Sequence, residues 1–353
     1  MNIFIRVDAS VSTGTGHLMR CLTLADEMKS SGCAITFVCR DLPGNLFALL
    51  EQKGYAIGRL PGQAGHDVPL DWRADAAATT AFIKAGGQRA DWVIVDHYEL
   101  DGRWESALRA CTGRIMVIDD LADRTHDCDL LLDQNYYPNL ESRYEGLVPL
   151  GCRKLLGPEY VLLRPEFNQQ RERLRKRDGQ VRRILIFFGG SDPENLTMTA
   201  LDAIQRLQRS DIAVDVVVGG SNPYRNEIEQ RCRLVPNANY HCQVLNMAEL
   251  IAEADLAIGA GGAAMWERCI LGLPTLTVLF AANQEKTTIS VASQGAINYL
   301  GWTHQLNAQE YVEAMRTMIA SPDKLKAIGD NAMSLMGGTI STGTRSVATA
   351  LLG

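Results

Sequence analysis

The segment Gly14-Thr15-Gly16-His17-Leu18-Met19-Arg20 is the strongest candidate for a reactive site, because it combines a glycine turn with an imidazole and a guanidinium. The segment follows the apolar run 2–7 and opens into a stretch with helical periodicity near 17–31. A glycine turn between a strand and a helix exposes backbone N–H groups at the helix N-terminus, where an anion can bind. His17 and Arg20 are three residues apart and therefore share one face of that helix.

Two roles are open to His17: it can cap the helix, or it can act as a general base. The positive end of the helix and Arg20 both disfavour a protonated imidazole, so we expect His17 to be neutral near pH 7, as a general base must be. We therefore favour catalysis. A dinucleotide site is disfavoured, because Met19 stands where the third glycine of G-x-G-x-x-G is required.

A second glycine turn, Gly189-Gly190-Ser191-Asp192, follows the apolar run 184–188. Ser191 or Asp192 can cap the helix that follows, and Pro193 suits its first turn. Capping does not explain the two glycines, which also allow a phosphate to approach the backbone closely. We expect a phosphate at this helix start.

A third glycine turn contains Gly261 and Gly262 and leads into a helix with Met265 and Glu267. Glu267 could accept hydrogen bonds from a ribose diol, although a lone helical Glu is more often exposed to solvent. Asn283-Gln284 begins another helix beyond the next strand. Three such helix starts in one half of the chain predict a nucleotide diphosphate held largely by backbone dipoles.

Carboxylates end several strands of the first half, as in Asp96-His97-Tyr98 and in Asp119-Asp120. In open α/β sheets the carboxyl ends of the strands line the ligand crevice. Asp96 and Tyr98 are therefore expected near His17, although carboxylates at such positions also anchor loops.

Apolar runs alternate with helical patterns along the whole chain, which is typical of parallel sheets covered on both faces. Strands are expected at 2–7, 34–39, 92–96, 114–118, 129–132, 183–188, 213–218, 239–242, 255–259 and 274–279. The fold class is thus α/β, with two Rossmann-like doubly wound domains facing a cleft. The expected parts are an N-terminal domain over 1–165, a charged linker over 166–181, a C-terminal domain over 182–335 and a final helix over 336–353.

Composition limits the function. The chain has 353 residues, 46% of them hydrophobic and 22% charged, with a formal charge of -6, which argues against a general nucleic-acid surface. Its nine cysteines have no CxxC or metal-ligand spacing, so no metal is expected. The sequence shows no signal peptide and no stretch of membrane-span length, so membrane insertion is not expected and a cytoplasmic location fits best.

Several segments together resemble the PseG family of UDP-sugar hydrolases. They occur in collinear order through nearly the whole chain and comprise Asp8-Ala9-Ser10, 14–20, Asp96-His97-Tyr98, 128–135, 163–167, 189–192 and Asn283-Gln284-Glu285. The family belongs to the pseudaminic acid pathway and releases UDP from UDP-2,4-diacetamido-2,4,6-trideoxy-β-L-altrose. Its products lead to nonulosonic acids, which are used to glycosylate flagellin or other surface glycans.

The resemblance implies a GT-B fold like that of MurG, in which the final helix crosses back onto the first domain. It implies an enzyme whose base, His17, activates a water for inverting attack on the anomeric carbon, with no cofactor. Substrate or water would be positioned by Asp8, Gly14, Gly16, Arg20, Asp96 and Tyr98. UDP would be bound by Gly189, Gly190, Ser191, Asp192, Gly261, Gly262, Met265, Glu267, Asn283 and Gln284. The expected partners are the UDP-sugar and UDP alone, and a monomer is favoured.

Three alternatives remain open from the sequence. The first is a MurG-like glycosyltransferase, in which a sugar acceptor replaces water. The second is a hydrolase of a related nucleotide-linked diacetamido sugar, as in a legionaminic-type pathway. The third is a sensor that binds the nucleotide sugar without turning it over, against which His17 argues.

Overall fold

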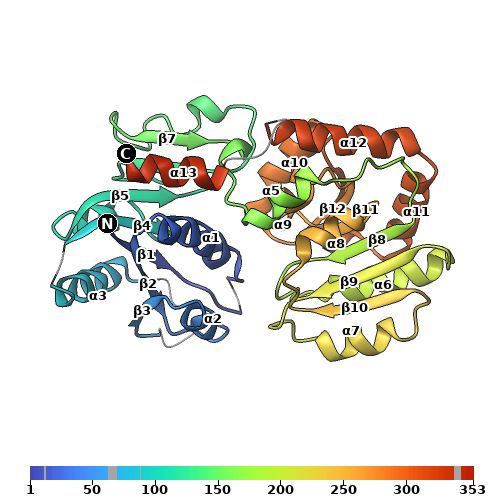
Figure 1. Cartoon of the computed structure of the whole chain (residues 1–353), viewed down its shortest axis with the longest axis horizontal. Helices are drawn as coiled ribbons and strands as arrows, with labels where there is room; N and C mark the ends of the chain where they lie inside the picture. Colours follow the sequence, from blue (N-terminus) through green and yellow to red (C-terminus); the bar gives the residue numbers. More distant parts are fainter. Residues whose placement is uncertain (12, 63–69, 88, 338–342) are drawn as a thin grey trace. The chain divides into compact units, whose positions relative to one another are not determined.

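The computed structural model describes the whole chain except residues 12, 63–69, 88 and 338–342 (Figure 1). The chain divides into two compact units. The first unit contains Met1–Asn135, Asn139–Leu163 and the C-terminal helix, and the second contains Tyr136–Pro138 and the chain from Arg164 onward to the helix before the last. No helix among the described residues combines the length and the apolar character that a membrane crossing requires.

The first unit is built on a parallel sheet of seven strands in the order β3-β2-β1-β4-β5-β6-β7. Its central strands are rich in buried β-branched residues, as expected for a sheet covered on both faces. The strands are β1 (Asn2–Val7), β2 (Ala34–Arg40), β3 (Ala56–Leu60), β4 (Ala90–Asp96), β5 (Thr112–Ile118), β6 (Leu130–Asp133) and β7 (Arg153–Leu156).

Helices cover both faces of this sheet (Figure 1). One apolar cluster joins one face to α1 (Gly16–Ser30), α2 (Phe47–Gln52) and α13 (Gly343–Leu352). A second cluster joins the other face to α3 (Trp72–Ala85) and α4 (Gly102–Leu108). Because successive side chains of a strand point to opposite faces, each central strand contributes to both clusters.

The last helix, α13, packs against α1 in the first unit. The indole Nε1 of Trp92 on β4 donates to the carbonyl of Leu351 at 3.0 Å. Thr344 accepts from the backbone N–H of Leu163 at 3.0 Å and donates to its carbonyl at 2.9 Å. The end of the chain is therefore part of the core that also supports the start of α1.

The second unit repeats this architecture with a parallel sheet of six strands in the order β10-β9-β8-β11-β12-β13. The strands are β8 (Arg183–Phe187), β9 (Ala213–Val218), β10 (Ala238–Cys242), β11 (Leu256–Ala260), β12 (Thr275–Leu279) and β13 (Asn298–Trp302). The helices are α5 (Pro165–Glu172), α6 (Leu196–Leu207), α7 (Arg225–Cys232), α8 (Met247–Glu253), α9 (Ala264–Ile270), α10 (Glu285–Ser293), α11 (Ala308–Ile319) and α12 (Pro322–Leu335). The predicted α/β class with two doubly wound sheets is confirmed.

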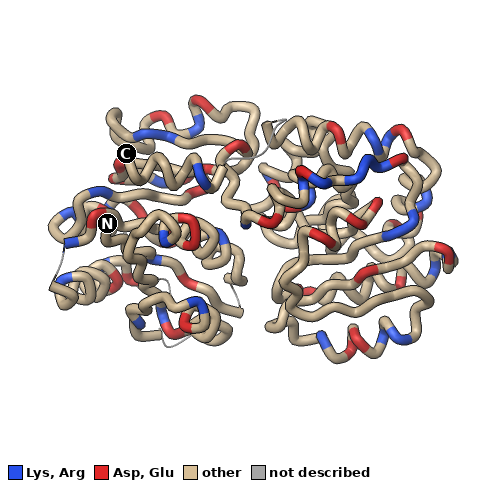
Figure 2. The backbone as a smooth tube through the Cα atoms, in the orientation of Figure 1, with Lys and Arg blue, Asp and Glu red and all other residues tan. Residues whose placement is uncertain are grey.

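The charged segment 166–181, expected to be a linker, is an integral part of the second unit. Helix α5 packs against α8 and α9, and the densest run of Lys and Arg follows it (Figure 2). The Arg177 guanidinium donates to the carbonyls of Ile251, Ala254 and Leu271 at 2.6–2.9 Å. Arg177 thus satisfies carbonyl groups at the C-terminal ends of α8 and α9, where cations are favoured.

Replacing Leu351 by Ala should lower the free energy of unfolding by about 2–5 kcal/mol, because the side chain is fully buried in the cluster shared with α1. The neighbouring Leu352 is 45% exposed, so Leu352→Ala is the matched control and should change stability by less than about 1 kcal/mol. Chemical denaturation measures both. Equal losses in the two variants would contradict the packing of α13 described above.

Candidate active site

Each sheet reverses its strand order at one point, between β1 and β4 in the first unit and between β8 and β11 in the second. At such a point the connections leave toward opposite faces, and a crevice opens beyond the carboxyl ends of the two strands. The turn that carries His17 and the residue Asp96 follow β1 and β4. The two other glycine turns follow β8 and β11. The sequence-predicted residues are thus concentrated at the two reversal points.

His17 lies in the first turn of α1 and contacts Asp96 at the end of β4, with 2.5 Å between the imidazole Nδ1 and the carboxylate Oδ1. A carboxylate is an acceptor only, so His17 acts as the donor to Asp96 when Nδ1 carries the proton, and in that neutral tautomer Nε2 bears the lone pair. The Tyr98 ring meets the imidazole edge to face, with 4.6 Å between centroids. The ring of His17 is therefore held by two residues that follow the same strand.

Arg20 completes this group from one turn further along α1. Its Nε and Nη2 donate to the two oxygens of Asp96 at 2.6 and 2.7 Å, and Nη1 donates to Asp120 at 3.1 Å. Burial alone would raise the pKa of the Asp96 carboxyl, but Arg20 and His17 outweigh it and hold that pKa well below its usual range. Asp96 is therefore an anion that orients His17, and both of its oxygens are occupied.

Asp8 is not placed to position a substrate, contrary to the prediction from sequence. Its carboxylate binds Arg6 at 2.6 and 3.0 Å and the side chain and backbone N–H of Arg40 at 2.7 and 2.8 Å. Arg6 is fully buried and also binds Asp75. Asp8 is thus a counter-ion that joins β1 to β2 beneath the His17 turn.

The turn before α1 depends on Gly14, which has a φ of +75°. Its backbone pairs with Ser10, the N–H donating to the Ser10 carbonyl at 2.9 Å. Gly16 begins the helix, and Thr15 at the N-cap makes no side-chain cap. Since the Thr15 side chain does not cap the first N–H groups of α1, an anion or a polar substrate group is a suitable acceptor for them.

In the second unit, Asp192 caps α6 and does not reach toward a ligand. Its buried carboxylate accepts from the backbone N–H groups of Leu196 and Thr197 at 2.9 and 3.0 Å and from the Thr197 hydroxyl at 2.6 Å. A phosphate cannot use the same two N–H groups, so the predicted phosphate contact at the start of α6 is wrong on that point. Gly189, Gly190 and Ser191 precede the capped turn and are half-buried.

Polar groups without partners gather around Gly261 and Gly262. Gln284 Oε1 and Thr288 Oγ1 are buried and accept or donate no hydrogen bond among the described residues. A Cβ added at Gly261 would lie 2.1 Å from Thr288 Oγ1, and one added at Gly262 would lie 3.0 Å from the amide nitrogen of Gln284. Buried polar groups normally have partners, so this turn is built for a polar ligand group.

The other predicted UDP contacts divide between the core and the surface. Met265 is fully buried, so its side chain is a core residue and the predicted ligand contact is not supported. Glu267 is half-buried and lies 3.7 Å from the Arg164 guanidinium. Burial raises the pKa of the Glu267 carboxyl, and Arg164 opposes that rise. Asn283 is exposed at the start of the turn before α10.

Comparison with known proteins shows which sequences and folds this chain is similar to. Residues 184–335 match the glycosyltransferase family 28 C-terminal domain. Over 296 residues the chain is 27% identical to a UDP-2,4-diacetamido-2,4,6-trideoxy-beta-L-altropyranose hydrolase of Campylobacter jejuni, covering 84% of this chain and 97% of that protein. The resemblance to the PseG hydrolases is confirmed.

A further relative is the spore coat polysaccharide biosynthesis protein SpsG of Bacillus subtilis, 25% identical over 91% of this chain and 90% of that protein. Among solved structures, MurG of Acinetobacter baumannii superposes with a TM-score of 0.67 at 15% identity, covering 99% of both chains. The glycosyltransferase WaaG superposes with a TM-score of 0.52 at 14% identity over the full length of both chains. These likenesses show the GT-B fold predicted from the resemblance to the PseG hydrolases.

The sequence analysis did not identify the buried polar side chains of the candidate site. Arg268 and Thr288 carry no motif signal, and their buried polar atoms without partners among the described residues are seen only in the structure. Asp96 was expected near His17, but its ion pair with Arg20 was not predicted, since spacing says nothing about a contact between residues 76 apart in the chain. Among the described residues, no group of three His, Cys, Asp or Glu side chains has the geometry of a metal site.

Asp96→Asn should lower the free energy of unfolding at pH 7 by about 3 kcal/mol, because it removes the anion that two nitrogens of the buried Arg20 contact and leaves only the longer contact with Asp120. The pKa of Asp96 is depressed in the folded state, so its stabilising effect is present above the unfolded-state pKa and is lost as the pH falls through about 4 and below. The unfolding free energies of the two proteins should therefore converge toward acid pH. Denaturant titrations from pH 7 to pH 3 measure this, and parallel curves would contradict it.

Proposed function

We propose that the chain is a UDP-sugar hydrolase that releases UDP from a UDP-linked 2,4-diacetamido-2,4,6-trideoxy hexose of the altrose type. The observation that carries the proposal is the imidazole of His17, held by Asp96 at the start of α1 through Nδ1, which makes Nε2 the nitrogen proposed to act as the base. The similarity to the hydrolase of Campylobacter jejuni supports it, because that similarity covers 97% of the relative. The first unit supplies the base and the second unit supplies the nucleotide site.

In the proposed reaction, His17 Nε2 removes a proton from a water molecule. The water oxygen forms a bond to the anomeric carbon, the bond from that carbon to the UDP oxygen breaks, and its electron pair leaves with UDP. Attack opposite to the leaving group inverts the configuration at the anomeric carbon. The Asp96 carboxylate fixes the proton on Nδ1 and stabilises the imidazolium that forms, as the third member of a catalytic triad does.

The leaving group explains why one base can suffice. The terminal phosphate of UDP has a pKa of roughly 6 by analogy with phosphate monoesters, so it departs as an anion near neutral pH. Ordinary glycosides need a general acid to protonate a poor leaving group, and this substrate does not. Backbone N–H groups at the turns with Gly190 and Gly262 are the proposed donors to the departing diphosphate.

The proposed nucleotide site consists of the turns after β8 and β11 with the start of α10. Gln284 Oε1 is expected to accept from a ligand N–H or O–H group and the Thr288 hydroxyl to bind a polar ligand atom, because these buried oxygens have no partner among the described residues. Glu267 is the proposed acceptor for the ribose diol. Asp192 and Met265 are left out, since one caps α6 and the other is in the core.

A glycosyltransferase of the MurG type is the alternative, and the fold alone does not separate the two activities. The sequence comparison favours hydrolysis, since similarity to an N-acetylglucosamine transferase of Acetivibrio thermocellus covers only 43% of this chain. UDP release without any acceptor distinguishes them. A panel of UDP- and GDP-linked diacetamido sugars, scored for nucleotide release, would identify the sugar and separate an altrose-type from a legionaminic-type substrate.

His17→Asn should reduce kcat by at least about a hundredfold, because it removes the general base, and should leave the Kd for UDP within about threefold of the wild-type value. His241→Asn is the matched control, since His241 also contacts a carboxylate, that of Asp215, at 3.0 Å. That variant should retain full activity. Initial-rate assays of UDP release and calorimetric titration with UDP measure both quantities.

A folded His17→Asn variant with wild-type kcat would exclude His17 as the base. A variant that loses UDP binding and turnover together would instead place His17 at the nucleotide site. Circular dichroism and thermal melts of all variants establish that they are folded.

A further inference from the structure

Arg268 of α9 is a buried cation with unused hydrogen-bond donors. The residue is 2% exposed, and its Nη2 donates to the carbonyl of Ala260 at 2.6 Å. Its Nε and Nη1 are buried and have no partner among the described residues. No carboxylate of the described chain lies within ion-pair distance of this guanidinium, whereas most of the buried arginines described above have one.

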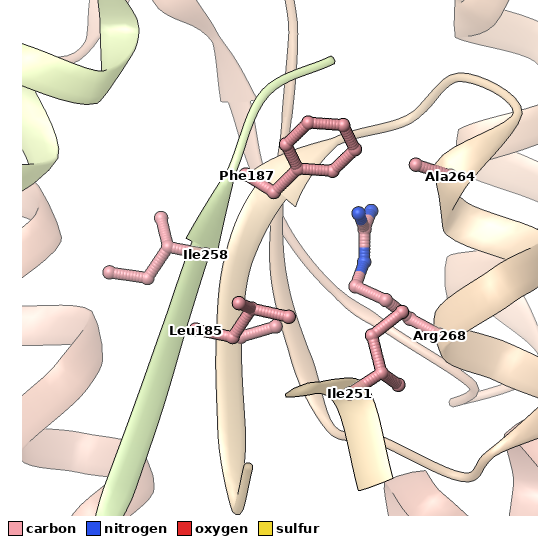
Figure 3. Close-up of a pocket in the computed structure, with 7 residues that line it drawn as sticks. Leu185, Phe187, Ile251, Ile258, Ala264 and Arg268 are labelled. Carbon is pink, nitrogen blue, oxygen red and sulfur yellow. The ribbon is translucent and has the colours of Figure 1, made fainter. Parts of the chain in front are cut away.

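The guanidinium is packed among apolar side chains of β8, β11 and α8. Figure 3 shows it between the Phe187 ring and Ala264, while Leu185 and Ile251 lie lower along its aliphatic stem. A Cβ added at Gly259 would lie 2.6 Å from the Phe187 carbonyl oxygen and 2.9 Å from Nη1, so the glycine leaves room for both the neighbouring strand and the guanidinium. Phe187 precedes the turn with Gly189 and Gly190, and Ala264 follows the turn with Gly261 and Gly262.

An unpaired buried charge is costly for the folded state. Burial lowers the pKa of the Arg268 guanidinium to about 10, so the group is still charged near pH 7. A well-packed apolar side chain of the same size at such a position is commonly neutral or stabilising. Residues that lower the stability of the folded state are concentrated at functional sites. Arg268 therefore lacks a structural justification comparable to that of Arg20 or Arg177.

We propose that Arg268 is a positioning residue that stabilises the binding of an anionic ligand group, the diphosphate of a nucleotide, at the turns after β8 and β11. This inference rests on the proposed nucleotide site. The buried guanidinium gives both turns a positive potential, and the low-dielectric surroundings screen it weakly. Its Nη2 bond to Ala260 fixes the strand end from which the Gly261-Gly262 turn departs.

The test compares the affinities of uridine, UMP and UDP for the wild-type chain, Arg268→Met and Arg268→Lys by calorimetric titration. The gain in affinity from uridine to UDP measures recognition of the diphosphate alone. We expect Arg268→Met to reduce that gain by about tenfold and to leave the uridine affinity within about twofold. Arg268→Lys keeps the charge and should retain most of the gain.

Arg177→Met is the matched control. Arg177 is another partly buried guanidinium of the second unit, but its donors all reach backbone carbonyls. Its loss should lower the free energy of unfolding and leave the ratio of UDP to uridine affinity unchanged. Arg268→Met should do the opposite: its unfolding free energy without ligand should equal or exceed the wild-type value, and UDP should raise its Tm less.

If the wild-type chain binds UDP and Arg268→Met has an unchanged ratio of UDP affinity to uridine affinity, the role of Arg268 is overturned. The proposed function then remains intact. If Arg268→Met fails to fold, the neutral polar variant Arg268→Gln is measured in its place. A ratio of UDP affinity to uridine affinity equal to that of the wild type would overturn the inference equally. A wild-type chain that does not bind UDP would overturn the nucleotide site itself.

Discussion

The ion pair between Asp96 and Arg20 is the interaction on which the first unit depends. It ties the first turn of α1 to the end of β4, across the point where the sheet reverses its strand order. The same carboxylate contacts the imidazole of His17, so one anion fixes the helix and the proposed base together. Neither group could be buried without the other, because an unpaired charge at this depth would destabilise the fold. A base held in this way loses little freedom when a substrate binds, which favours catalysis.

The two units differ in the partners that their buried arginines have. In the first, the buried cations Arg6 and Arg20 are neutralised by the carboxylates of Asp8, Asp75 and Asp96. In the second, the described residues offer no partner to two nitrogens of the buried Arg268 or to the side-chain oxygens of Gln284 and Thr288. A satisfied network makes a rigid support, while unsatisfied groups are suited to a ligand that completes them. This contrast agrees with a base in the first unit and a nucleotide site in the second.

Much of the fold could be predicted from the sequence, because buried parallel strands appear as continuous apolar runs. The strands β3, β7 and β13 were missed, since each lies at a sheet edge and is short or partly polar. The glycine turns were found because a turn before a helix has a local signal. The roles of Asp8 and Asp192 were misjudged, since a carboxylate after a strand looks the same whether it binds a ligand, an arginine or a helix end.

The central claim is that a water molecule activated by His17 attacks the anomeric carbon. Hydrolysis in ¹⁸O-labelled water, with no acceptor present and with both products analysed by mass spectrometry at early times, tests it most directly. The account predicts that UDP is released without label and that the new oxygen is found at the anomeric position of the sugar. Label in the terminal phosphate of UDP would show attack at phosphorus, and the absence of UDP release would exclude hydrolysis; either result contradicts the account.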